Sequence, residues 1–234
     1  MSGGPTPSPG ATPGRPPDGD IADRLAALDT PALSDALDRL GIDGQVVGIL
    51  PLDPGFRLVG TAYTVRMLPQ GRSGHSVGDY IDEVAPGQVV VIDNGGRLDA
   101  TVWGDILTTV AHRDGVAGTV IDGVCRDVGR SLELGYPIYS RSNTMRTGKD
   151  RVSAEAYNEA VQLAGVRVEP GDWLRGDADG VVVIPADAVG EVLAAAEGVA
   201  AAEDQIRRLV GEGGRLDEIR SRLDYHRLQS RSDR

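Results

Sequence analysis

Residues 88–140, QVVVIDNGGRLDATVWGDILTTVAHRDGVAGTVIDGVCRDVGRSLELGYPIYS, decide the fold of this chain. Uncharged apolar runs, typical of strands buried on both faces, alternate here with segments whose apolar residues recur at helical spacing. In order, the expected elements are a strand at 88–93, a helix from 103 to about 114, a strand at 118–123, a helix at 128–134 and a strand at 137–140. Strands and helices that alternate at this spacing predict right-handed βαβ units, with the ligand crevice beyond the carboxyl ends of the strands.

The segment before this stretch predicts two helices and then short strands. The first helix begins at Ile21, after the possible cap Asp20. The second helix runs from Thr30, its expected N-cap, to Gly41, which ends it. Short extended runs broken by glycine and proline follow between residues 46 and 67.

The C-terminal part of the chain has a different pattern. The stretch VRVEPGDWLRGDADGVVVIP, residues 166–185, predicts short antiparallel strands with turns at Pro170-Gly171 and Asp179-Gly180. An alanine-rich helix from about 187 to 210 and a last amphipathic helix at 216–223 follow. The sequence therefore predicts a mixed α/β sandwich with helices at both ends.

Composition divides the chain into a domain and two tails. Residues 1–20 contain eleven glycines or prolines, so we expect a disordered tail there. Residues 21–228 are expected to form one folded domain, and residues 229–234 a polar C-terminal tail. We expect neither a membrane span nor a secretory signal, and the single cysteine, Cys125, suits a reducing cytoplasm.

Several functional classes are disfavoured by the charge and by the scarce residues. A net charge of −11 and a pI of about 4.7 argue against a nucleic-acid partner. Three scattered histidines argue against a histidine-rich zinc or iron site. Lys149 is the only lysine and lies in a loop-like stretch, so Schiff-base chemistry is not expected. Cys125, on a predicted buried strand, is interpreted as a core residue.

Polar groups follow two of the predicted strands at the points where the next helix begins. If the first of these helices starts near Gly104, the amides of Ile106 and Leu107 lie unpaired in its first turn and can hold a carboxylate. Arg126 can grip the same anion, and Asp127 can hold Mg²⁺ or Mn²⁺ that keeps several waters. Such a site would bind a 2-keto acid and favour cleavage of the carbon–carbon bond beta to its keto group.

The same residues also have structural interpretations. Arg126 and Asp127 could form a surface ion pair or a helix cap. Asp105 is expected in a first helical turn from the helix dipole alone, and Trp103 could simply pack in the core. Taken by themselves, these residues leave both interpretations open.

One spacing connects the two segments. Asp105 is followed, after twenty residues, by Arg126-Asp127, which gives the pattern D-x20-R-D. It is accompanied by AGTVIDGVCRD, LSDALDRLG, LVGTAYTV, PGQVVVIDNGG, GYPIYSR and GDWLRGDADGVVVIP. With these motifs, residues 21–228 resemble the RraA-like family, which includes the class II 4-hydroxy-4-methyl-2-oxoglutarate / 4-carboxy-4-hydroxy-2-oxoadipate aldolases.

The resemblance implies an αββα sandwich of the swivelling β/β/α type, with N- and C-terminal helices, assembled as trimers or hexamers. It implies that Arg126 binds and polarises a pyruvate moiety and that Asp127 ligates Mg²⁺ or Mn²⁺, directly or through water. The other implied site residues are Gly104, which allows close approach, Asp105 in an orienting catalytic role, and Ile106 and Leu107, whose backbone amides bind the substrate carboxylate.

The sequence departs from the aldolases at one point. Where they usually carry an acidic residue shortly after the Arg-Asp pair, this chain has Arg130, Ser131 and Leu132, and Glu133 comes one place late. Arg130 could meet a second substrate carboxylate or lie on the surface, and both interpretations stay open.

Two functions of different classes follow from the resemblance. The first is a divalent-metal-dependent pyruvate aldolase that acts on a small 2-keto acid, with oxaloacetate decarboxylation as a second activity. The alternative is a non-catalytic regulator of the RraA type that binds and inhibits a ribonuclease E-like partner. A methyltransferase is not favoured, because no glycine-rich loop for the methyl donor follows a strand.

Overall fold

The structure is a computed structural model that describes residues 18–71 and 78–223. In chain order, its elements are α1 (Asp18–Ala26), α2 (Thr30–Leu40), β1 (Gln45–Val46), β2 (Leu50–Pro51), β3 (Leu58–Pro69), the 3₁₀ helix η1 (Asp79–Glu83), β4 (Gln88–Asp93), α3 (Asp105–Arg113), β5 (Gly118–Cys125), α4 (Val128–Leu134), β6 (Ile138–Asn143), β7 (Val152–Tyr157), β8 (Val161–Leu163), β9 (Val166–Val168), β10 (Trp173–Asp177), β11 (Gly180–Ile184), α5 (Val189–Gly211) and α6 (Leu216–Arg222). No helix within these two ranges is both long enough and apolar enough to cross a membrane.

One sheet contains most of the strands, in the order β1-β11-β10-β3-β4-β5-β6-β2, with β7 paired to β3. Strands β3, β4, β5 and β6 are parallel, which confirms the predicted βαβ units, while β10, β11 and β1 add an antiparallel half. The strands at the two ends of this order, β1 and β2, are joined by only three residues, and β2 also contacts β11. The sheet therefore curls back on itself.

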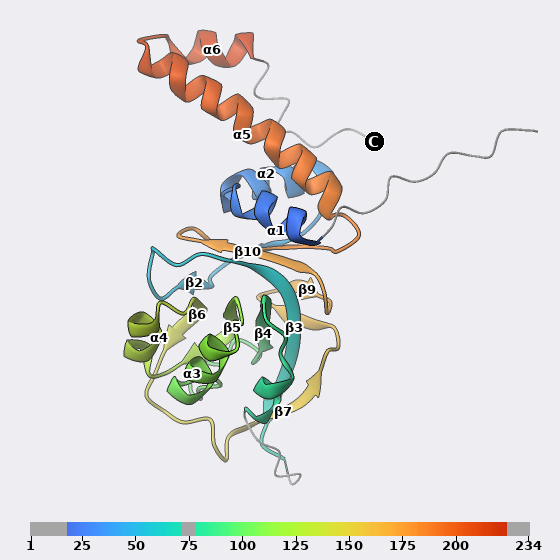
Figure 1. Ribbon diagram of the computed structural model, residues 1–234, viewed down its shortest axis with the longest axis vertical. Helices are drawn as coiled ribbons and strands as arrows, with labels where there is room; N and C mark the ends of the chain where they lie inside the picture. The colour runs from blue at the N-terminus through green and yellow to red at the C-terminus, as the bar shows by residue number, and fades with distance from the viewer. Residues whose placement is uncertain (1–17, 72–77, 224–234) are drawn as a thin grey trace, which may run out of the picture.

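Helices cover both outer faces of the curled sheet (Figure 1). Helices α3 and α4 pack against the parallel strands, and α1, α2 and α5 pack against β10 and β11. Side chains alternate along β11: Val181 and Val183 point into the core between the two halves of the sheet, whereas Val182 and Ile184 meet the helices. This helix–sheet–sheet–helix arrangement confirms the αββα sandwich.

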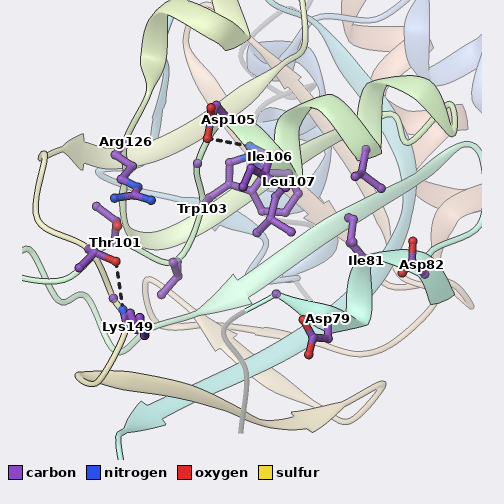
Figure 2. Close-up of a pocket in the computed structure, with 16 residues that line it drawn as sticks. Asp79, Ile81, Asp82, Thr101, Trp103, Asp105, Ile106, Leu107, Arg126 and Lys149 are labelled. Atoms are coloured by element: carbon purple, nitrogen blue, oxygen red, sulfur yellow. Dashed lines mark hydrogen bonds between the residues drawn. The ribbon is translucent and has the colours of Figure 1, made fainter.

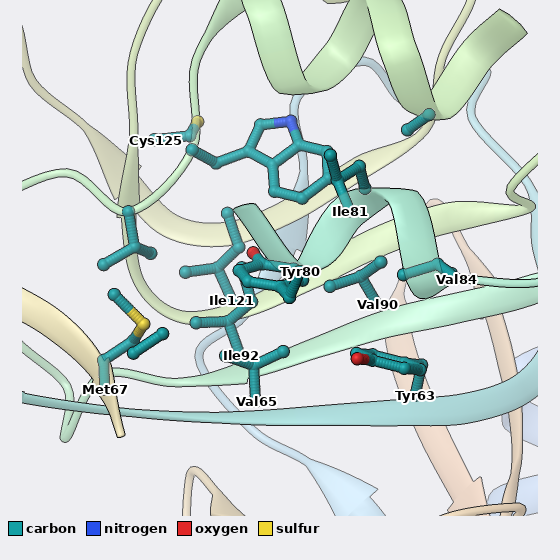
Figure 3. Packing of buried hydrophobic residues seen from close by; sticks show 14 of the residues in the cluster. Tyr63, Val65, Met67, Tyr80, Ile81, Val84, Val90, Ile92, Ile121 and Cys125 are labelled. Atoms are coloured by element: carbon teal, nitrogen blue, oxygen red, sulfur yellow. The ribbon is translucent and has the colours of Figure 1, made fainter. Parts of the chain in front are cut away.

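The core beneath the parallel strands supports the start of α3 (Figure 3). It includes Ile92 and Ile121 from two neighbouring strands, and Trp103 from the loop that leads into α3. The Trp103 ring stacks on that of Tyr136, with the ring centroids 6.2 Å apart. Cys125 is fully buried here, and burial raises the pKa of its thiol, as expected for a packing residue.

Several sequence predictions need correction at the N-terminus. Helix α1 begins at Asp18, so the predicted disordered tail is wrong for residues 18–20, and Asp20 lies inside the helix. The N-cap of α2 is Asp29, whose side chain accepts a hydrogen bond from the Ala32 amide at 2.9 Å, and not Thr30. The rest of the predicted N-terminal tail and the polar C-terminal tail at 229–234 lie outside the described residues.

Thr30 instead anchors α2 to the sheet through a buried carboxylate. Its amide and its hydroxyl donate to the two carboxylate oxygens of Asp177, at 2.8 and 2.6 Å. The Asp179 amide also donates to Asp177, at 3.1 Å. Burial opposes ionisation of Asp177, but these hydrogen bonds and the nearby charge of Arg175 outweigh it and lower the pKa of the carboxyl group.

We expect Asp177→Asn to destabilise the fold by about 2 kcal/mol at neutral pH, because an amide cannot accept from all three donors. A folded-state pKa below the unfolded value of 3.8 stabilises the protein above that pH, and this contribution is lost as pH falls through the folded pKa. The variant should therefore lose less stability than the wild type as the pH falls below about 4. Urea unfolding across this range measures both effects, and equal acid sensitivity of the two proteins would show the assignment to be wrong.

Candidate functional site

A pocket of about 460 Å³ opens beside the N-terminus of α3 and next to Arg126, which directly follows β5 (Figure 2). It is formed by η1, by the loop into α3, by the start of α3 and by the loop between β6 and β7. Its lining residues are Gly78, Asp79, Ile81, Asp82, Thr101, Val102, Trp103, Gly104, Asp105, Ile106, Leu107, Val110, Arg126, Thr147, Gly148 and Lys149.

The start of α3 is fixed by a short hydrogen-bonded chain. The indole N–H of Trp103 donates to the Thr108 hydroxyl at 2.9 Å. That hydroxyl and the Thr108 amide both donate to the Gly104 carbonyl oxygen, at 2.9 and 3.0 Å. Gly104 is the N-cap and the helix begins at Asp105, which meets the condition that the helix starts near Gly104. The prediction that Trp103 lies on this helix is wrong, because Trp103 precedes the N-cap.

The first amides of α3 bond to carboxylates. The Asp105 amide donates to Oδ2 of Asp127 at 3.2 Å, and the Ile106 amide donates to Oδ1 of Asp105 at 2.9 Å. No acceptor for the Leu107 amide is found among residues 18–71 and 78–223. Two protein carboxylates thus occupy the positive end of this helix. The N-terminus of a helix is also the end at which free anions bind in proteins generally.

The side chain of Ile106 does not pack in the core, although Ile106 shares helical spacing with Val110 and lies next to Leu107. Its side chain is 74% exposed, whereas the side chains of α3 that are fully buried are Thr108 and Ala111. The helix therefore turns the side chain of Ile106 toward solvent at the edge of the pocket.

Arg126 and Asp127 lie directly across from this helix end. The Arg126 amide donates to the Trp103 carbonyl oxygen at 2.9 Å, which joins the end of β5 to the start of α3. Nε of Arg126 lies 3.3 Å from Oδ2 of Asp127, and both side chains are about 40% exposed. Figure 2 shows the guanidinium group of Arg126 at the pocket wall.

The backbone of Asp127 adopts an uncommon conformation. Its φ of 54° and ψ of 40° lie in the left-handed region, which non-glycine residues rarely occupy. Although Asp127 directly precedes α4, its side chain makes no capping hydrogen bond to that helix and turns back toward α3. Asp127 therefore occupies the N-cap position of α4, as one interpretation of the sequence predicted, but its carboxylate is directed at the site and does not cap that helix.

Gly104 lets these groups approach one another. A Cβ atom at this position would lie 2.8 Å from Oδ2 of Asp127 and 3.2 Å from Nε of Arg126. The φ of −152° at Gly104 suits any residue, so the requirement for glycine comes from space and not from conformation.

Arg130 lies outside the pocket. Its Nη1 donates to Glu133 at 2.9 Å, and its Nε donates to the Thr109 hydroxyl at 3.3 Å, on the outer side of α3 and α4. The structure thus favours the surface interpretation of Arg130 over a contact with substrate.

Sequence reasoning missed three charged residues that line the pocket. Asp79 and Asp82 come from η1, and Lys149 comes from the loop between β6 and β7. These residues lie more than twenty positions from the D-x20-R-D motif at one end or the other, so no local pattern connects them to it. The one available signal was that the only lysine of the chain follows a glycine in a polar turn.

The donor set fits a divalent cation that keeps most of its water. Among the described residues, no three histidine, cysteine or acidic side chains gather as a metal cage. Mg²⁺ commonly binds through only one or two protein carboxylates, with substrate and water completing the shell. Asp127 can serve as that ligand, since Oδ2 already meets Arg126 and the Asp105 amide while Oδ1 is left for a cation.

Comparison with known proteins places this site in a family. The family model RraA-like, described as Aldolase/RraA, matches residues 30–183. The chain is 36% identical over 208 residues to protein DlpA of Legionella pneumophila, covering 88% of this chain but 34% of DlpA, so it spans about a third of that relative. It is 33% identical over 193 residues to a protein of Halalkalibacterium halodurans, covering 82% and 90% of the two chains. That relative is named provisionally as a 4-hydroxy-4-methyl-2-oxoglutarate aldolase.

A solved structure extends the comparison to a second kind of protein. Streptomyces coelicolor RraAS2, described as an unusual member of the RNase ES inhibitor RraA protein family, matches with a TM-score of 0.76 and 32% identity. The match covers 83% of this chain and 99% of that structure. The family model spans more than half of the chain and includes the whole stretch from Asp105 to Asp127, and the chain therefore belongs to the RraA-like family.

Proposed function

We propose that the protein is a divalent-metal-dependent pyruvate aldolase, which cleaves a 4-hydroxy-2-keto acid to pyruvate and a second carbonyl compound. The observation that carries this proposal is that Arg126 lines one pocket together with the first residues of α3, while Asp127, behind that lining, accepts from the Asp105 amide and lies 3.3 Å from Arg126. In the described structure two protein carboxylates already bond to those amides. A substrate carboxylate can accept hydrogen bonds from the same backbone N–H groups.

Each residue of the site has a role in this reaction. The amides of Ile106 and Leu107 bind the carboxylate of the keto acid, with the Ile106 amide exchanging Asp105 for substrate. Arg126 binds the keto-acid end and stabilises the negative charge that develops on the keto oxygen as the bond breaks. Asp105, once released from the Ile106 amide, orients the substrate.

Asp127 would hold Mg²⁺ or Mn²⁺, which when bound supplies Lewis acidity to the keto oxygen. Loss of carbon dioxide from oxaloacetate leaves the same electron pair next to the keto group as aldol cleavage does. Oxaloacetate decarboxylation is therefore part of the proposal. The family description and the name of the Halalkalibacterium halodurans relative support a carbon–carbon lyase.

Release of pyruvate tests the proposal directly. The purified chain is given 4-hydroxy-4-methyl-2-oxoglutarate or oxaloacetate with Mg²⁺, and pyruvate is followed through lactate dehydrogenase and oxidation of NADH. We expect catalytic turnover with at least one substrate. Absence of turnover with both, from protein with a cooperative unfolding transition, would contradict the aldolase proposal.

Replacement of Gly104 by alanine should damage the site without damaging the fold. The added methyl group would displace Asp127 or Arg126, so we expect kcat/KM for pyruvate release to fall by about tenfold or more. The melting temperature should stay within a few degrees, because the backbone conformation suits alanine. The matched control is Gly129→Ala on α4, where the added Cβ meets no atom within 4 Å. Full activity of Gly104→Ala would show that close approach at this point is unnecessary.

A regulator that binds a ribonuclease E-like partner is the second candidate. The match to RraAS2 over 99% of that structure favours it, as does the absence of an acidic residue at positions 130–132. A chain of net charge −11 could dock onto a basic surface of such a partner. Calorimetric titration against a purified ribonuclease E tests this candidate, and tight binding by a protein without turnover would favour it over the aldolase.

We also propose assembly as a homotrimer or hexamer, with the pocket close to a subunit boundary. Helix α5 extends beyond the sheet and carries α6 at its far end, as Figure 1 shows, so this arm is placed to meet another subunit. Light scattering on the full chain tests the proposal, and a monomer at micromolar concentration would contradict it.

A further inference from the structure

The pocket has two walls of opposite charge. Figure 2 shows Arg126 and Lys149 on one side, with Thr101 between them, and Asp79 and Asp82 on the other side. The floor between the two walls is apolar and includes Trp103. Coulombic attraction therefore directs the anionic groups of a ligand to the wall that carries the two cations.

Lys149 differs from most arginines of this region in having no ionic partner among the described residues; Arg151, which also has none, instead donates to the carbonyl oxygens of Thr147 and Lys149. Within the described part of the chain, no carboxylate lies within 4.0 Å of its ammonium group. By contrast, three nearby arginines are paired: Arg130 with Glu133, Arg141 with Asp122 and Arg146 with Asp99. The charge of Lys149 is thus free to meet a ligand.

The turn that carries Lys149 is built against the pocket wall. A Cβ atom at Gly148 would overlap the carbonyl oxygen of Thr101, so only glycine lets the turn pack this closely. The Thr101 amide donates to the Arg146 carbonyl oxygen at 3.1 Å, and the Lys149 amide donates to the Thr147 hydroxyl at 3.2 Å. These contacts hold the backbone of Lys149 at the edge of the pocket.

The choice of residue also fits a single carboxylate. The chain has 23 arginines and one lysine, and the lysine stands in this pocket. An ammonium group is a compact charge that can follow one carboxylate on a flexible stem, whereas a guanidinium group favours a fixed two-pronged geometry. Arg126, which lies beside the amides of α3, suits the keto-acid end, and Lys149 lies farther along the same wall.

We propose that Lys149 is the specificity-determining residue of this site and binds the carboxylate at the far end of a dicarboxylic 2-keto acid. The proposal rests on the proposed function for the placement of the keto-acid end. Lys149 thereby takes the role that the sequence had left open for Arg130. Substrates whose far end is uncharged should bind less well.

A binding experiment tests Lys149 independently of turnover. The ligands are 2-oxoglutarate and 2-oxopentanoate, which have the same chain length but end in a carboxylate and a methyl group, and which lack the 4-hydroxyl group needed for cleavage. They are titrated by calorimetry, with Mg²⁺ present, into wild type, Lys149→Met, Lys149→Arg and the control Arg130→Met. Lys149 is exposed, so we expect all variants to fold.

The wild type should prefer 2-oxoglutarate, and Lys149→Met should weaken its binding about tenfold while leaving 2-oxopentanoate unchanged. Lys149→Arg should keep most of the preference, and Arg130→Met should behave as wild type. An equal loss for both ligands, an unchanged preference in Lys149→Met, or no binding of 2-oxoglutarate to the wild type would overturn the proposal.

Kinetics separate this proposal from the proposed function. The substrate pair is 4-hydroxy-4-methyl-2-oxoglutarate and its analogue 4-hydroxy-4-methyl-2-oxopentanoate, which lacks the second carboxylate. Pyruvate release with the same substrate preference in wild type and Lys149→Met would reject the role of Lys149 and keep the aldolase. A lost binding preference in Lys149→Met, without pyruvate release by the wild type, would reject the aldolase and keep the role of Lys149.

Discussion

Asp127→Asn is expected to lower kcat/KM for pyruvate release by at least about a hundredfold. Asparagine has nearly the same shape, tolerates the left-handed backbone conformation and can still accept the hydrogen bond from the Asp105 amide. What it lacks is the negative charge that binds a divalent cation and pairs with Arg126. Steady-state kinetics at saturating Mg²⁺, together with thermal unfolding, measure the effect.

The control for this prediction is a second aspartate with a positive φ. Asp150, at 61°, is exposed and does not line the pocket, so Asp150→Asn should leave pyruvate release unchanged. A loss of less than about tenfold in Asp127→Asn would mean that the charge at this position is not needed for the reaction.

Arg126→Met is expected to lower kcat/KM by about a hundredfold to a thousandfold, the range seen when one donor to a developing oxyanion is removed. Methionine keeps the stem of the side chain but removes the positive charge opposite the amides of Ile106 and Leu107. The loss should fall mainly on kcat, because the charge on the keto oxygen is greatest in the transition state.

Two further variants make the prediction for Arg126 specific. Arg126→Lys should recover only part of the activity, since an ammonium group cannot form two parallel hydrogen bonds with one anion. Arg130→Met removes a cation of the same region that lies outside the pocket and should be nearly silent. Equal losses in Arg126→Met and Arg130→Met would point to a general effect of charge and away from contact with substrate.

The parallel half of the fold could be predicted because its signals are local. Residues 88–93 form β4 and residues 128–134 form α4, as predicted. In the antiparallel half, the predicted turn at Asp179-Gly180 likewise joins β10 to β11. Apolar runs, helical spacing and turn residues report on neighbours in the chain, and here the tertiary structure agreed with them.

Contacts between distant segments could not be predicted in the same way. Strand β7 pairs with the far half of β3, nearly ninety residues earlier, and no pattern in VSAEAY identifies that partner. The curl of the sheet depends on the short connection between β1 and β2, which are only two residues each. Such pairings are decided by packing across the whole sheet.

In the candidate site, too, local sequence signals predicted some residues, whereas contacts between distant segments placed others. The structure brings together Gly104, Asp105, Arg126 and Asp127, which follow strand ends that the sequence located well. Lys149 reaches the pocket only because a glycine turn packs on Thr101, a tertiary contact without a local signature. Lys149 does lie in a loop, as predicted, but the sequence did not indicate that this loop lines the pocket.

The central claim is that Asp127 and Arg126 form a metal-dependent site for cleavage next to a keto group. It is tested most directly by pyruvate release from 4-hydroxy-4-methyl-2-oxoglutarate and oxaloacetate with Mg²⁺, with Mn²⁺ and with a chelator, in wild type beside Asp127→Asn. We expect turnover by the wild type that the chelator abolishes and that added metal restores, and no comparable turnover by the variant under any condition. Turnover that survives the chelator and is equal in the variant would contradict the central claim.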